Sequence, residues 1–579
     1  MRRRSLLLLG LLVVVIAWIV YAGWTVIATR SDLQDARDSA TELKQALADS
    51  RDAQARAASS TLRDAVGSAH DRTSGPTWFA LSHLPFVGND FGAVRTLSSS
   101  LDDLAGSGLT PLVDVAGSLD GKAFTPRHGR IDLAALDTLR TPIARASGSF
   151  DTAASDLDAI DTADLMSAVR GPVSALIEDI DLGAELLHGA STAIDVGPAM
   201  VGADGPQRWL LVFQNNAEIR ATGGLPGSMA VVTADHGKLT LDETRAGHSF
   251  AELPQPVLPL TADEQKIYGQ ALGTWVLDAN FTPDFARVAD LLRARWERDT
   301  GQRLDGVMAV DPVVLSYLLD ATGPVTIQGG QLSTANAVPV LIHDVYMNVP
   351  DPAAQDAYYG AVTAGVFDHV VNGGRSPGRM LAALFRAANE HRLLIHSFHR
   401  PQQKEIAGTE VAGDAFAPHG DHPTVLVTLN DATGAKMQYY LRYDVHVTAS
   451  CQDGHQAYEA SMDLSSTAPK NARTLPWGVT GGGDFGIPAG TFVMNVRIYG
   501  PAGGEVGNVL LNGKRFQYER FSEHGRPVAM TPIFLDPGET VTLSWPMTAA
   551  AGQNGDTHVN VTPGVVPENE SSVVEAACR

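Results

Sequence analysis

The spacing of apolar residues changes several times along the chain, and each change predicts a different kind of element. Leu6–Ile27 is an uncharged apolar run, and about 20 such residues span a bilayer as a helix. From Ser31 to about Ala58, apolar residues recur at alternating intervals of three and four, as in a coiled-coil seam: Leu33, Ala36, Ala40, Leu43 and Leu47. We therefore expect a transmembrane helix that continues outward as a stalk, followed by mostly helical sequence up to residue 200.

The residues around the apolar run predict its orientation. Arginines precede it and interfacial aromatics end it: Arg2, Arg3, Arg4, Trp18, Tyr21 and Trp24. These favour a single-pass protein of the cell membrane, with a cytoplasmic N-terminus and an extracytoplasmic remainder. A signal peptide cleaved near "VYA" is the alternative. Pro76–Phe91 interrupts the helical part, and we expect a helix-hairpin turn packed by its own aromatics there, in preference to a contact with the membrane.

Strands and helices alternate from Gln207 onward. Trp209–Phe213 and Met229–Asp235 are short apolar runs of strand type, and Asp235–Lys238 has the polar, glycine-containing composition of a hairpin turn. Phe285–Gly301 is an amphipathic helix with glycine as its natural stop, and Pro312 stands in the first turn of a later helix. This alternation predicts an α/β domain over residues 201–400.

After about Pro401, short alternating strands are separated by Gly, Pro and Asn turns, which predicts an antiparallel β-sandwich at residues 415–579. The expected fold class is therefore α+β and multidomain. A cytoplasmic tip and transmembrane anchor occupy residues 1–28, and an extracytoplasmic helical stalk or bundle occupies residues 29–200. A stalk of this kind also allows an oligomer.

Composition narrows the partners and the compartment. The 579 residues suggest three or so domains, and the net charge of −22 argues against a nucleic-acid partner, because phosphate contacts supply most non-specific affinity. The chain has two cysteines, Cys451 and Cys578. In an oxidising compartment they predict one disulfide that fastens the C-terminal tail, and two free thiols are the alternative.

A polar segment between two apolar strands is the first candidate site. Arg220 offers a planar fork of donors suited to phosphate or carboxylate, and the backbone of Thr222, Gly223 and Gly224 could approach an anion. Gln214, Asn215 and Asn216 would add neutral donors. Arg245, at the end of the next strand pair, would converge on the same ligand. The architectural alternative is a buried polar plug in which Glu218 pairs with Arg220 and the amides bond the backbone.

A second group of polar residues precedes the helix at Phe285. Asp278 and Asp284 could bind a cation or act as acid and base, with Asn280 beside them, and their strand-end position suits a site. The local alternative is that Asp284 starts the helix and Asn280 makes a turn. The sequence has no GxSxG, HExxH, Walker or dinucleotide-binding motif in a suitable setting.

Three stretches together resemble the actinobacterial membrane-protein family DUF4012, a domain of unknown function: "LLVFQNNAEIRATGG", "WVLDANFTPDF" and "DGVMAVDPVVLSYLLDATGPVTI". The resemblance covers the stalk and the α/β domain, and it implies no activity.

The order of elements is also similar, more distantly, to the LytR-CpsA-Psr phosphotransferases. That resemblance implies a fold for transferring a glycopolymer from a polyprenyl-pyrophosphate lipid to the cell wall, with arginines and aspartate-bound magnesium. It places one family arginine at Arg245. However, Asn215 and Gly227 stand where the family has its metal-binding aspartates, and His343 and Asp344 stand near its late arginine pair. Magnesium is therefore a weakly supported cofactor, and no metal ligands are assigned.

Three hypotheses follow. The first is an envelope protein that binds or transfers a phosphate-linked wall glycopolymer, with Arg220 and Arg245 at the phosphate. The second is a non-catalytic scaffold that kept the fold and lost the metal. The third, ranked last, is a glycan hydrolase using Asp278 and Asp284, because glycosidases need two carboxylates.

Overall fold

The computed structural model describes residues 2–49, 51–110, 113, 129–327, 330–373, 377–418, 420–566 and 571–578. The chain divides into two compact units. The helical unit comprises Met1–Pro126, Ile131–Pro198 and Ser376–Arg379, and the β-rich unit comprises Arg127–Arg130, Ala199–Arg375 and Met380–Arg579.

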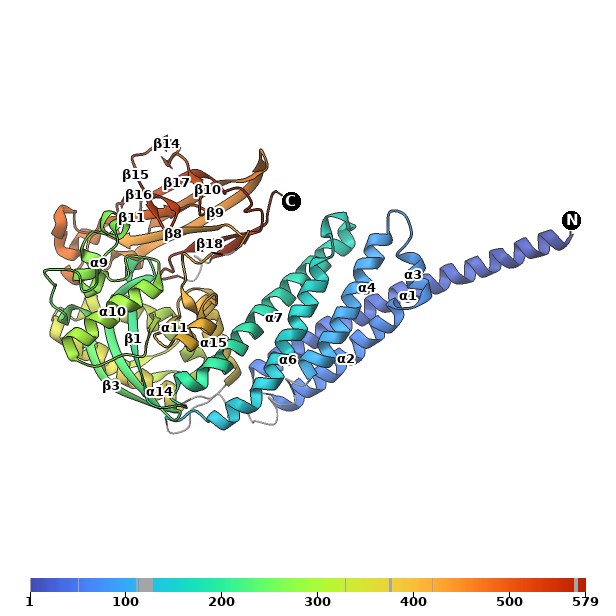
Figure 1. Cartoon of the computed structure of the whole chain (residues 1–579), viewed down its shortest axis with the longest axis horizontal. Coiled ribbons are helices and arrows are strands. Elements are labelled where there is room, and N and C mark those ends of the chain that lie inside the picture. Colours follow the sequence, from blue (N-terminus) through green and yellow to red (C-terminus); the bar gives the residue numbers. More distant parts are fainter. Residues whose placement is uncertain are drawn as a thin grey trace. The chain divides into compact units, whose positions relative to one another are not determined.

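The helical unit contains long helices with shorter helical segments between some of them (Figure 1). They are α1 (Arg2–Ala48), α2 (Asp52–Thr73), α3 (Pro76–Leu81), α4 (Gly88–Asp103), the π-helix η1 (Leu104–Leu109), α6 (Leu133–Asp158), the 3-10 helix η2 (Thr162–Asp164) and α7 (Ser167–Met200). Apolar residues of these helices form its core, including Leu62, Val66, Leu97, Leu104 and Leu157.

The predicted stalk helix ends earlier than the sequence pattern suggests. Helix α1 stops at Ala48, and α2 folds back along it, as the ion pair of Arg72 with Asp32 at 2.6 Å shows. From Ser31 onward the buried positions of α1 are Ala36, Ser39, Leu43 and Ala46, while Ala40 and Leu47 are exposed. The predicted seam is therefore shifted on the helix, and it packs within the chain against α2.

The transmembrane part of the predicted fold class is not supported. Within the residues that the structure describes, no helix is long and apolar enough to cross a membrane. The side chains of residues 2–17, which make up much of the predicted span Leu6–Ile27, lie outside the described ones. From Ser31 onward the same helix is rich in charged residues and buries one side, with Ala36, Leu43 and Ala46. The fold is thus corrected to a mixed α/β protein with several sheets.

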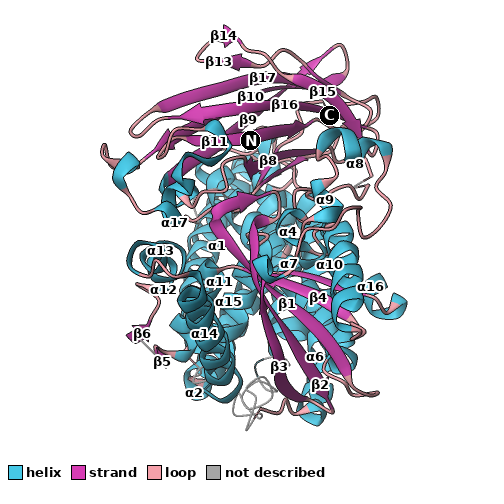
Figure 2. Cartoon of the chain, turned by 90° about the vertical axis from the view of Figure 1, so that its left-hand side faces the viewer, coloured by secondary structure: helices cyan, strands magenta, loops and turns pink. Residues whose placement is uncertain are grey.

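The first layer of the β-rich unit is a five-stranded sheet in the order β3-β2-β1-β4-β7 (Figure 2). Its strands are β1 (Gln207–Arg220), β2 (Gly223–Asp235), β3 (Lys238–Ala246), β4 (Gly306–Val310) and β7 (Leu394–Ser397). Only β1 and β4 run parallel; the other neighbours in this sheet are antiparallel. Asp235 pairs with Lys238 across the predicted hairpin turn.

Helix α10 (Phe285–Thr300) covers one face of this sheet. Its apolar side, with Phe285, Val288 and Trp296, shares a core with Leu210 and Val212 of β1. Asp284 caps its N-terminus by accepting hydrogen bonds from the N–H groups of Ala286 at 3.1 Å and Arg287 at 3.5 Å. Gly301 ends it in the left-handed region at φ 73°, which confirms the predicted stop.

The second part of the β-rich unit has two six-stranded sheets (Figure 2). One has the order β14-β13-β17-β10-β9, with β12 paired to β17, and the other has the order β15-β16-β11-β8-β18-β19. The strands are β8 (Thr424–Asp431), β9 (Leu441–Gln452), β10 (His455–Ser466), β11 (Phe492–Tyr499), β12 (Glu505–Val506), β13 (Leu510–Leu511), β14 (Lys514–Arg515), β15 (Glu519–Glu523), β16 (Arg526–Leu535), β17 (Thr540–Thr548), β18 (Thr557–Val561) and β19 (Ser572–Val574). Side chains from both sheets share one core, which includes Val427, Met462, Met494 and Leu543.

The remaining helices and a small hairpin lie between these strands in the chain. The helices are α8 (Ala262–Ile267), α9 (Ala271–Thr274), α11 (Pro312–Thr322), α12 (Ala337–Pro339), α13 (Val345–Asn348), α14 (Pro352–Gly373), α15 (Pro377–Asn389), α16 (Arg400–Ile406) and α17 (Trp477–Thr480). The 3-10 and π-helices are η3 (Gly247–Ser249), η4 (Val276–Asp278), η5 (Val340–Asp344), η6 (Glu410–Ala412), η7 (Met437–Tyr440), η8 (Ala472–Thr474) and η9 (Gly481–Gly486). A small hairpin pairs β5 (Val325–Ile327) with β6 (Gly330–Leu332).

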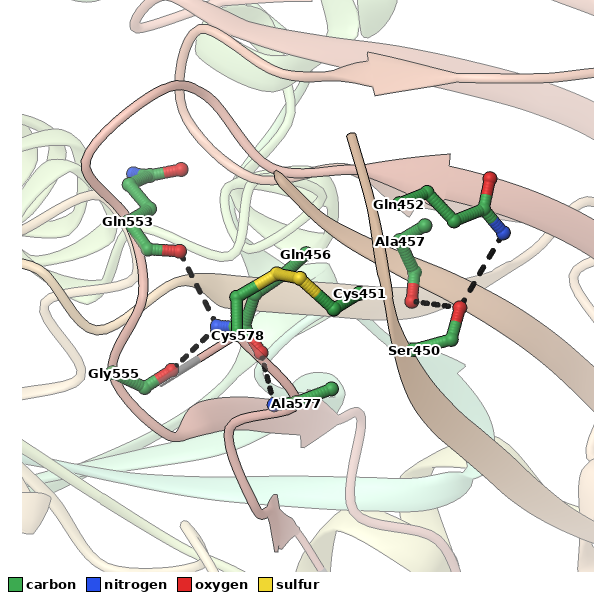
Figure 3. Close-up of a disulfide and its surroundings, with 9 residues drawn as sticks. All are labelled: Ser450, Cys451, Gln452, Gln456, Ala457, Gln553, Gly555, Ala577 and Cys578. Atoms are coloured by element: carbon green, nitrogen blue, oxygen red, sulfur yellow. Dashed lines mark hydrogen bonds between the residues drawn. A yellow bond between two sulfur atoms is a disulfide. The ribbon is translucent and has the colours of Figure 1, made fainter. Parts of the chain in front are cut away.

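The predicted disulfide between Cys451 and Cys578 is confirmed (Figure 3). It joins the end of β9 to the C-terminal tail, with Cα atoms 5.0 Å apart. Beside it, the Gln456 side chain accepts a hydrogen bond from the N–H of Ala577 at 2.9 Å and donates one to the carbonyl of Gly555 at 2.7 Å. The covalent bond and this buried amide therefore hold the tail at the same place.

Candidate functional site

The polar segment Gln214–Gly224 is the tip of the β1–β2 hairpin, and this tip leaves the α/β layer and enters the sandwich. Ile219 belongs to the sandwich core. Asn430 of β8 accepts a hydrogen bond from the N–H of Ala221 at 3.0 Å, and the Thr562 hydroxyl donates to the carbonyl of the same residue at 3.1 Å. The polar residues between two apolar strands therefore mark the point where one layer passes into the other.

The strand pairing is interrupted at this tip. Asn215 pairs with Leu225, but Ile219 pairs with Gly224, so three residues of β1 bulge out of the ladder. A Cβ atom at Gly224 would collide with the backbone of Asn215, which explains why this position holds glycine. The bulge turns polar side chains of β1 toward several different partners.

Neutral amides form the first of three groups in this site, and they hydrogen-bond to one another, although the buried Asn280 Oδ1 has no partner among the described residues. The Gln214 Oε1 accepts hydrogen bonds from the Thr222 hydroxyl at 3.0 Å, from the Gly224 N–H at 3.2 Å and from the Asn280 amide at 3.1 Å. Asn280 also donates to the Gly224 carbonyl at 2.7 Å. The predicted ligand donors Gln214, Thr222 and Asn280 are thus brought together, and they tie η4 and its loop to the hairpin.

The second group is charged and is centred on Glu218 and Arg220, near the end of β1. Arg220 donates to Glu218 at 2.9 Å and to Asp278 at 3.1 Å, and its guanidinium stacks on Phe281 at 4.8 Å. Lys436 forms a second ion pair with Glu218. The side chains of Glu218 and Arg220 are only 7% and 5% exposed. This arrangement is the polar plug that the sequence offered as the alternative to an anion site.

The charges around Glu218 keep its carboxylate ionised. Burial alone would raise the pKa of Glu218, but the charges of Lys436 and Arg220 outweigh it and hold that pKa below its ordinary value. Asp278 is different, because burial raises the pKa of its carboxyl above the usual range despite the neighbouring Arg220. Burial, followed by the charge of Glu218, likewise raises the pKa of Asp431.

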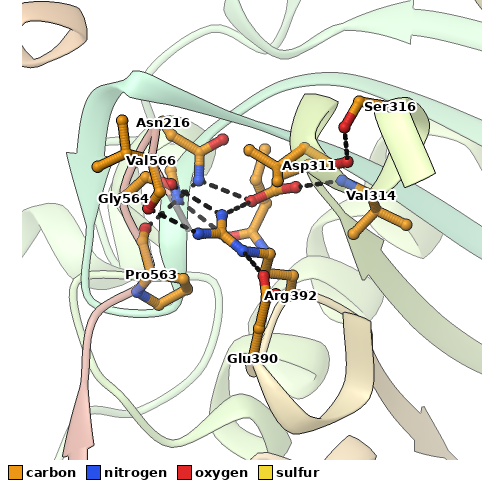
Figure 4. A network of polar contacts seen from close by, with 12 residues as sticks. Asn216, Asp311, Val314, Ser316, Glu390, Arg392, Pro563, Gly564 and Val566 are labelled. Atoms are coloured by element: carbon orange, nitrogen blue, oxygen red, sulfur yellow. Dashed lines mark hydrogen bonds and ion pairs between the residues drawn. The ribbon is translucent and has the colours of Figure 1, made fainter. Parts of the chain in front are cut away.

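A third group stands at the carboxyl ends of the parallel strands β1 and β4 (Figure 4). Asp311 accepts hydrogen bonds from Arg392 at 2.6 Å and from Asn216 at 2.9 Å, and it caps α11 through the N–H of Val314 at 2.9 Å. Arg392 also donates to Glu390 at 2.7 Å and to the Gly564 carbonyl at 2.8 Å. In open α/β sheets this edge holds the ligand; here the segment that follows β18 lies against it.

The other predicted site residues lie apart from this cluster. Arg245 pairs with Glu243 at 2.6 Å, and its guanidinium lies 5.5 Å from the Trp296 ring. It stands opposite Met229, whereas Arg220 stands opposite Gly223. Those positions are roughly 20 Å apart along β2 at the rise of an extended strand, so the two arginines do not converge as expected.

Asp284 acts as the helix cap described above, and burial raises the pKa of its carboxyl. Asn215 donates to the Tyr346 hydroxyl at 2.8 Å and accepts from the N–H of Ala217 at 3.0 Å. Gly223, at φ 128°, makes the tight turn of the hairpin. Each of these three residues therefore has a structural role: a helix cap, a tertiary hydrogen bond and a tight turn.

The residues at the two positions where the LytR-CpsA-Psr resemblance implied metal-binding aspartates do not fit Mg²⁺. Asn215 is a neutral amide already engaged by Tyr346, and the other matching position is Gly227. Carboxylate oxygens are what Mg²⁺ prefers in proteins. Across the described ranges, no group of three or more His, Cys, Asp or Glu side chains is arranged to hold a metal ion.

Several partners in the site were not identified from the sequence. Lys436, Asn430 and Arg392 lie far from the hairpin in the chain, and an unremarkable local pattern surrounds each of them. His343 was noted only as a departure from a family pattern. It accepts or donates hydrogen bonds with Asp344 at 2.8 Å and Tyr440 at 2.7 Å, on the π-helix η5.

Residues 204–346 match the family model described as Protein of unknown function (DUF4012). This segment is similar to the DUF4012 family. The DUF4012 match confirms the resemblance carried by the hairpin motif, and it contains the amide group, Asp278, Asp311 and η5. The family description assigns no activity.

No curated protein matches the chain. Among solved structures, a putative nutrient binding protein from Legionella pneumophila subsp. pneumophila is 8% identical, over 24% of this chain and 54% of that one. The matched part thus spans about half of that structure. The TM-score is 0.15, so this likeness carries no argument about fold or function.

Proposed function

We propose that the protein is a non-catalytic scaffold of the cell envelope, which works outside the cytoplasm and binds a glycopolymer. The observation that carries the proposal is the pairing of Arg220. Its guanidinium, the strongest anion donor of the DUF4012 motif, is 5% exposed and already engaged by Glu218 and Asp278. A ligand phosphate would have to displace two carboxylates from a buried arginine, which leaves Asp278 without its cation and Glu218 with Lys436 alone.

The transferase hypothesis calls for groups that can reach a lipid pyrophosphate and its metal. Arg245 is partly exposed, but it is far from Arg220 along β2 and pairs with Glu243. The positions expected for magnesium hold Asn215 and Gly227. The scaffold hypothesis needs none of these groups, because in it the hairpin tip fastens the α/β layer to the sandwich.

The hydrolase hypothesis asks for a proton donor and a second carboxylate on either side of a sugar bond. Asp278 has the raised pKa of a possible acid, but its Oδ1 accepts a hydrogen bond from Arg220 at 3.1 Å. Asp284 uses its carboxylate to cap α10. The ion pair with Arg220 and the cap of α10 therefore account for Asp278 and Asp284 without a catalytic role.

The sandwich offers a surface for a glycan. Trp477 is 66% exposed and Phe485 is 80% exposed, and both lie in the loop segment from α17 to η9. Phe485 has φ 60°, a conformation that side chains rarely adopt without a reason. Exposed aromatic faces of this kind suit the apolar faces of sugar rings.

The disulfide supports the proposed compartment. Disulfides persist in oxidising environments and are rare in the cytosol. Cys451 and Cys578 are 127 residues apart, and they are bonded here. Intact-mass analysis of protein made through its native route should show a chain two hydrogens lighter than the reduced form; two alkylatable thiols in unreduced protein would contradict the assignment.

Turnover and binding assays on the full chain test the proposed function directly. We expect no turnover of a polyprenyl-pyrophosphate-linked glycan with added Mg²⁺, and we expect binding of purified neutral wall polysaccharide. Turnover above a heat-denatured control would exclude the scaffold.

Matched aromatic variants test the binding surface. Trp477→Ala and Phe485→Ala should each weaken polysaccharide binding about 10-fold, since an aromatic contact with a ligand is worth around 1 kcal/mol or more. Phe534→Ala is the control, because Phe534 is also an exposed phenylalanine of the sandwich, at 53%. Equal binding by all three variants would assign the glycan to another surface.

A further inference from the structure

A short loop of the helical unit exposes apolar side chains at a conformational cost. Phe86 lies between α3 and α4, is 98% exposed and has φ 71°. Glycine or asparagine is the usual residue in that backbone region, and a bulky residue there is strained. Phe86 thus combines strain with full exposure of an aromatic ring, and neither stabilises the fold. Phe79 at 53% and Leu84 at 42% are exposed on the same segment.

The loop is firmly held, so the exposure of these side chains is built into the fold. Trp78 is buried, donates from its indole to the Phe91 carbonyl at 2.8 Å, and packs edge-on against the Phe91 ring at 5.2 Å. The Gly88 N–H closes the turn on the Leu84 carbonyl at 3.0 Å. A Cβ at Gly88 would lie 2.6 Å from the Ser82 carbonyl oxygen, so the turn is tight.

A second group of exposed apolar side chains lies on α1 in the same unit. Val20 is 67% exposed, Tyr21 52%, Trp24 55% and Ile27 72%. Their spacing places them along one side of the helix. The opposite side of this stretch, with Ala22, Thr25 and Thr29, is buried.

Arg72 connects the two groups. Its guanidinium lies 5.5 Å from the Trp24 ring and pairs with Asp32, and α3 starts four residues later at Pro76. Arg95 lies over the Phe79 ring at 6.0 Å. Large apolar rings edged by arginines are typical of the boundary between lipid tails and headgroups, because arginine stems lie along apolar surface while their charge stays in water.

We propose that Phe79, Leu84 and Phe86, with the exposed side of α1 at Val20–Ile27, form a lipid-binding rim that inserts into the headgroup region of a membrane surface. The rim needs no helix that crosses the bilayer; it lies on the surface as interfacial segments do. Apolar insertion is its main driving force, because the chain carries a net charge of −22 and anionic lipid would repel it. Zwitterionic lipid therefore suffices.

The test uses the full chain and phosphatidylcholine vesicles. Phe86→Asn suits the backbone at φ 71° and removes the ring, so the fold is retained. Burial of one phenylalanine corresponds to a partition change of about 10-fold or more. We expect that loss for Phe86→Asn in vesicle co-sedimentation, with no change for Phe534→Asn, an exposed control in the sandwich. Raising NaCl from low to high concentration should change binding little.

A probe at position 86 gives an independent readout of insertion. The two native cysteines are bonded to each other, so Phe86→Cys supplies a thiol for an environment-sensitive fluorophore. We expect a blue shift on adding vesicles and quenching by nitroxide lipid, and neither effect for Phe534→Cys. A chain that does not bind vesicles, or one whose probe at position 86 stays in water when bound, would overturn the proposal.

Discussion

The two arginines of the first candidate site give the most informative comparison. Replacing Arg220 with methionine keeps most of the apolar stem and removes the charge. Glu218 would retain Lys436, and Asp278, with a side chain 21% exposed, can take up water. Breaking a buried ion pair costs about 3–5 kcal/mol, and these remaining partners place Arg220→Met at the lower end, about 3 kcal/mol.

Arg245→Met should be much milder. The side chains of Arg245 and Glu243 are 35% and 31% exposed, so water screens their ion pair. Such pairs contribute up to about 1 kcal/mol. An architectural role for the hairpin thus predicts a difference of about 2 kcal/mol between the two variants, whereas a shared anion site predicts similar effects, seen in ligand binding.

Urea unfolding of the oxidised full chain, followed by tryptophan fluorescence and circular dichroism, measures this difference. The two compact units can unfold in separate transitions, so the shift is taken from the transition that the variant moves. Adding Asp278→Asn to Arg220→Met should recover part of the loss, with a coupling of about 0.5–3 kcal/mol. Equal midpoints for Arg220→Met and Arg245→Met, or an unchanged midpoint for Arg220→Met, would refute the reasoning.

Three further predictions concern stability. Burial raises the pKa of Glu523 from 4.5 to about 7. The contribution of Glu523 to the free energy of unfolding is therefore complete below pH 4.5, and it falls by about 3 kcal/mol as the pH rises through 7. Glu523→Gln should flatten the dependence of the unfolding free energy on pH, and an unchanged dependence would count against this prediction. Cys451→Ser with Cys578→Ser should cost up to about 4–5 kcal/mol in the chain-entropy model; the urea midpoint should fall below that of oxidised wild type and match that of reduced wild type, and a midpoint equal to that of oxidised wild type would contradict the prediction. Gly224→Ala should destabilise the protein by about 3 kcal/mol or more, because the added Cβ clashes with the hairpin backbone. Gly360 is a helical glycine with open space around it, so Gly360→Ala should stabilise the protein by up to about 1 kcal/mol. Thermal unfolding measures both variants, and similar shifts for the two would contradict the prediction.

Elements whose stability is local could be predicted from the sequence. Helix α10 begins at its aspartate cap and ends at Gly301, because capping and the left-handed stop involve residues within one turn. The hairpin at Asp235–Lys238 depends on its own turn residues. The bond between Cys451 and Cys578 followed from their being the two cysteines of the chain.

Where an element packs against another that is distant in the sequence, the apolar periodicity alone did not predict where the element ends or which of its positions are buried. The apolar spacing after Ser31 correctly indicated a helix, but it could not show that the helix would stop at Ala48 or that α2 would return along it. The buried positions Ser39 and Ala46 are small residues, which a search for large apolar side chains passes over. Close helix packing selects small residues, and only the partner helix reveals where they are needed.

In the candidate site, the sequence determined which charged and amide side chains the hairpin tip carries, and the tertiary structure decided which partners they bind. Two-residue spacing on a strand already places Glu218 and Arg220 on one side, so their ion pair could be anticipated. Asp278 and Lys436, which complete the group, are 58 and 218 residues away from their partners in the chain. A charge withdrawn from water must be paired, but which partner it meets depends on how the hairpin tip enters the sandwich, and no local pattern encodes that path.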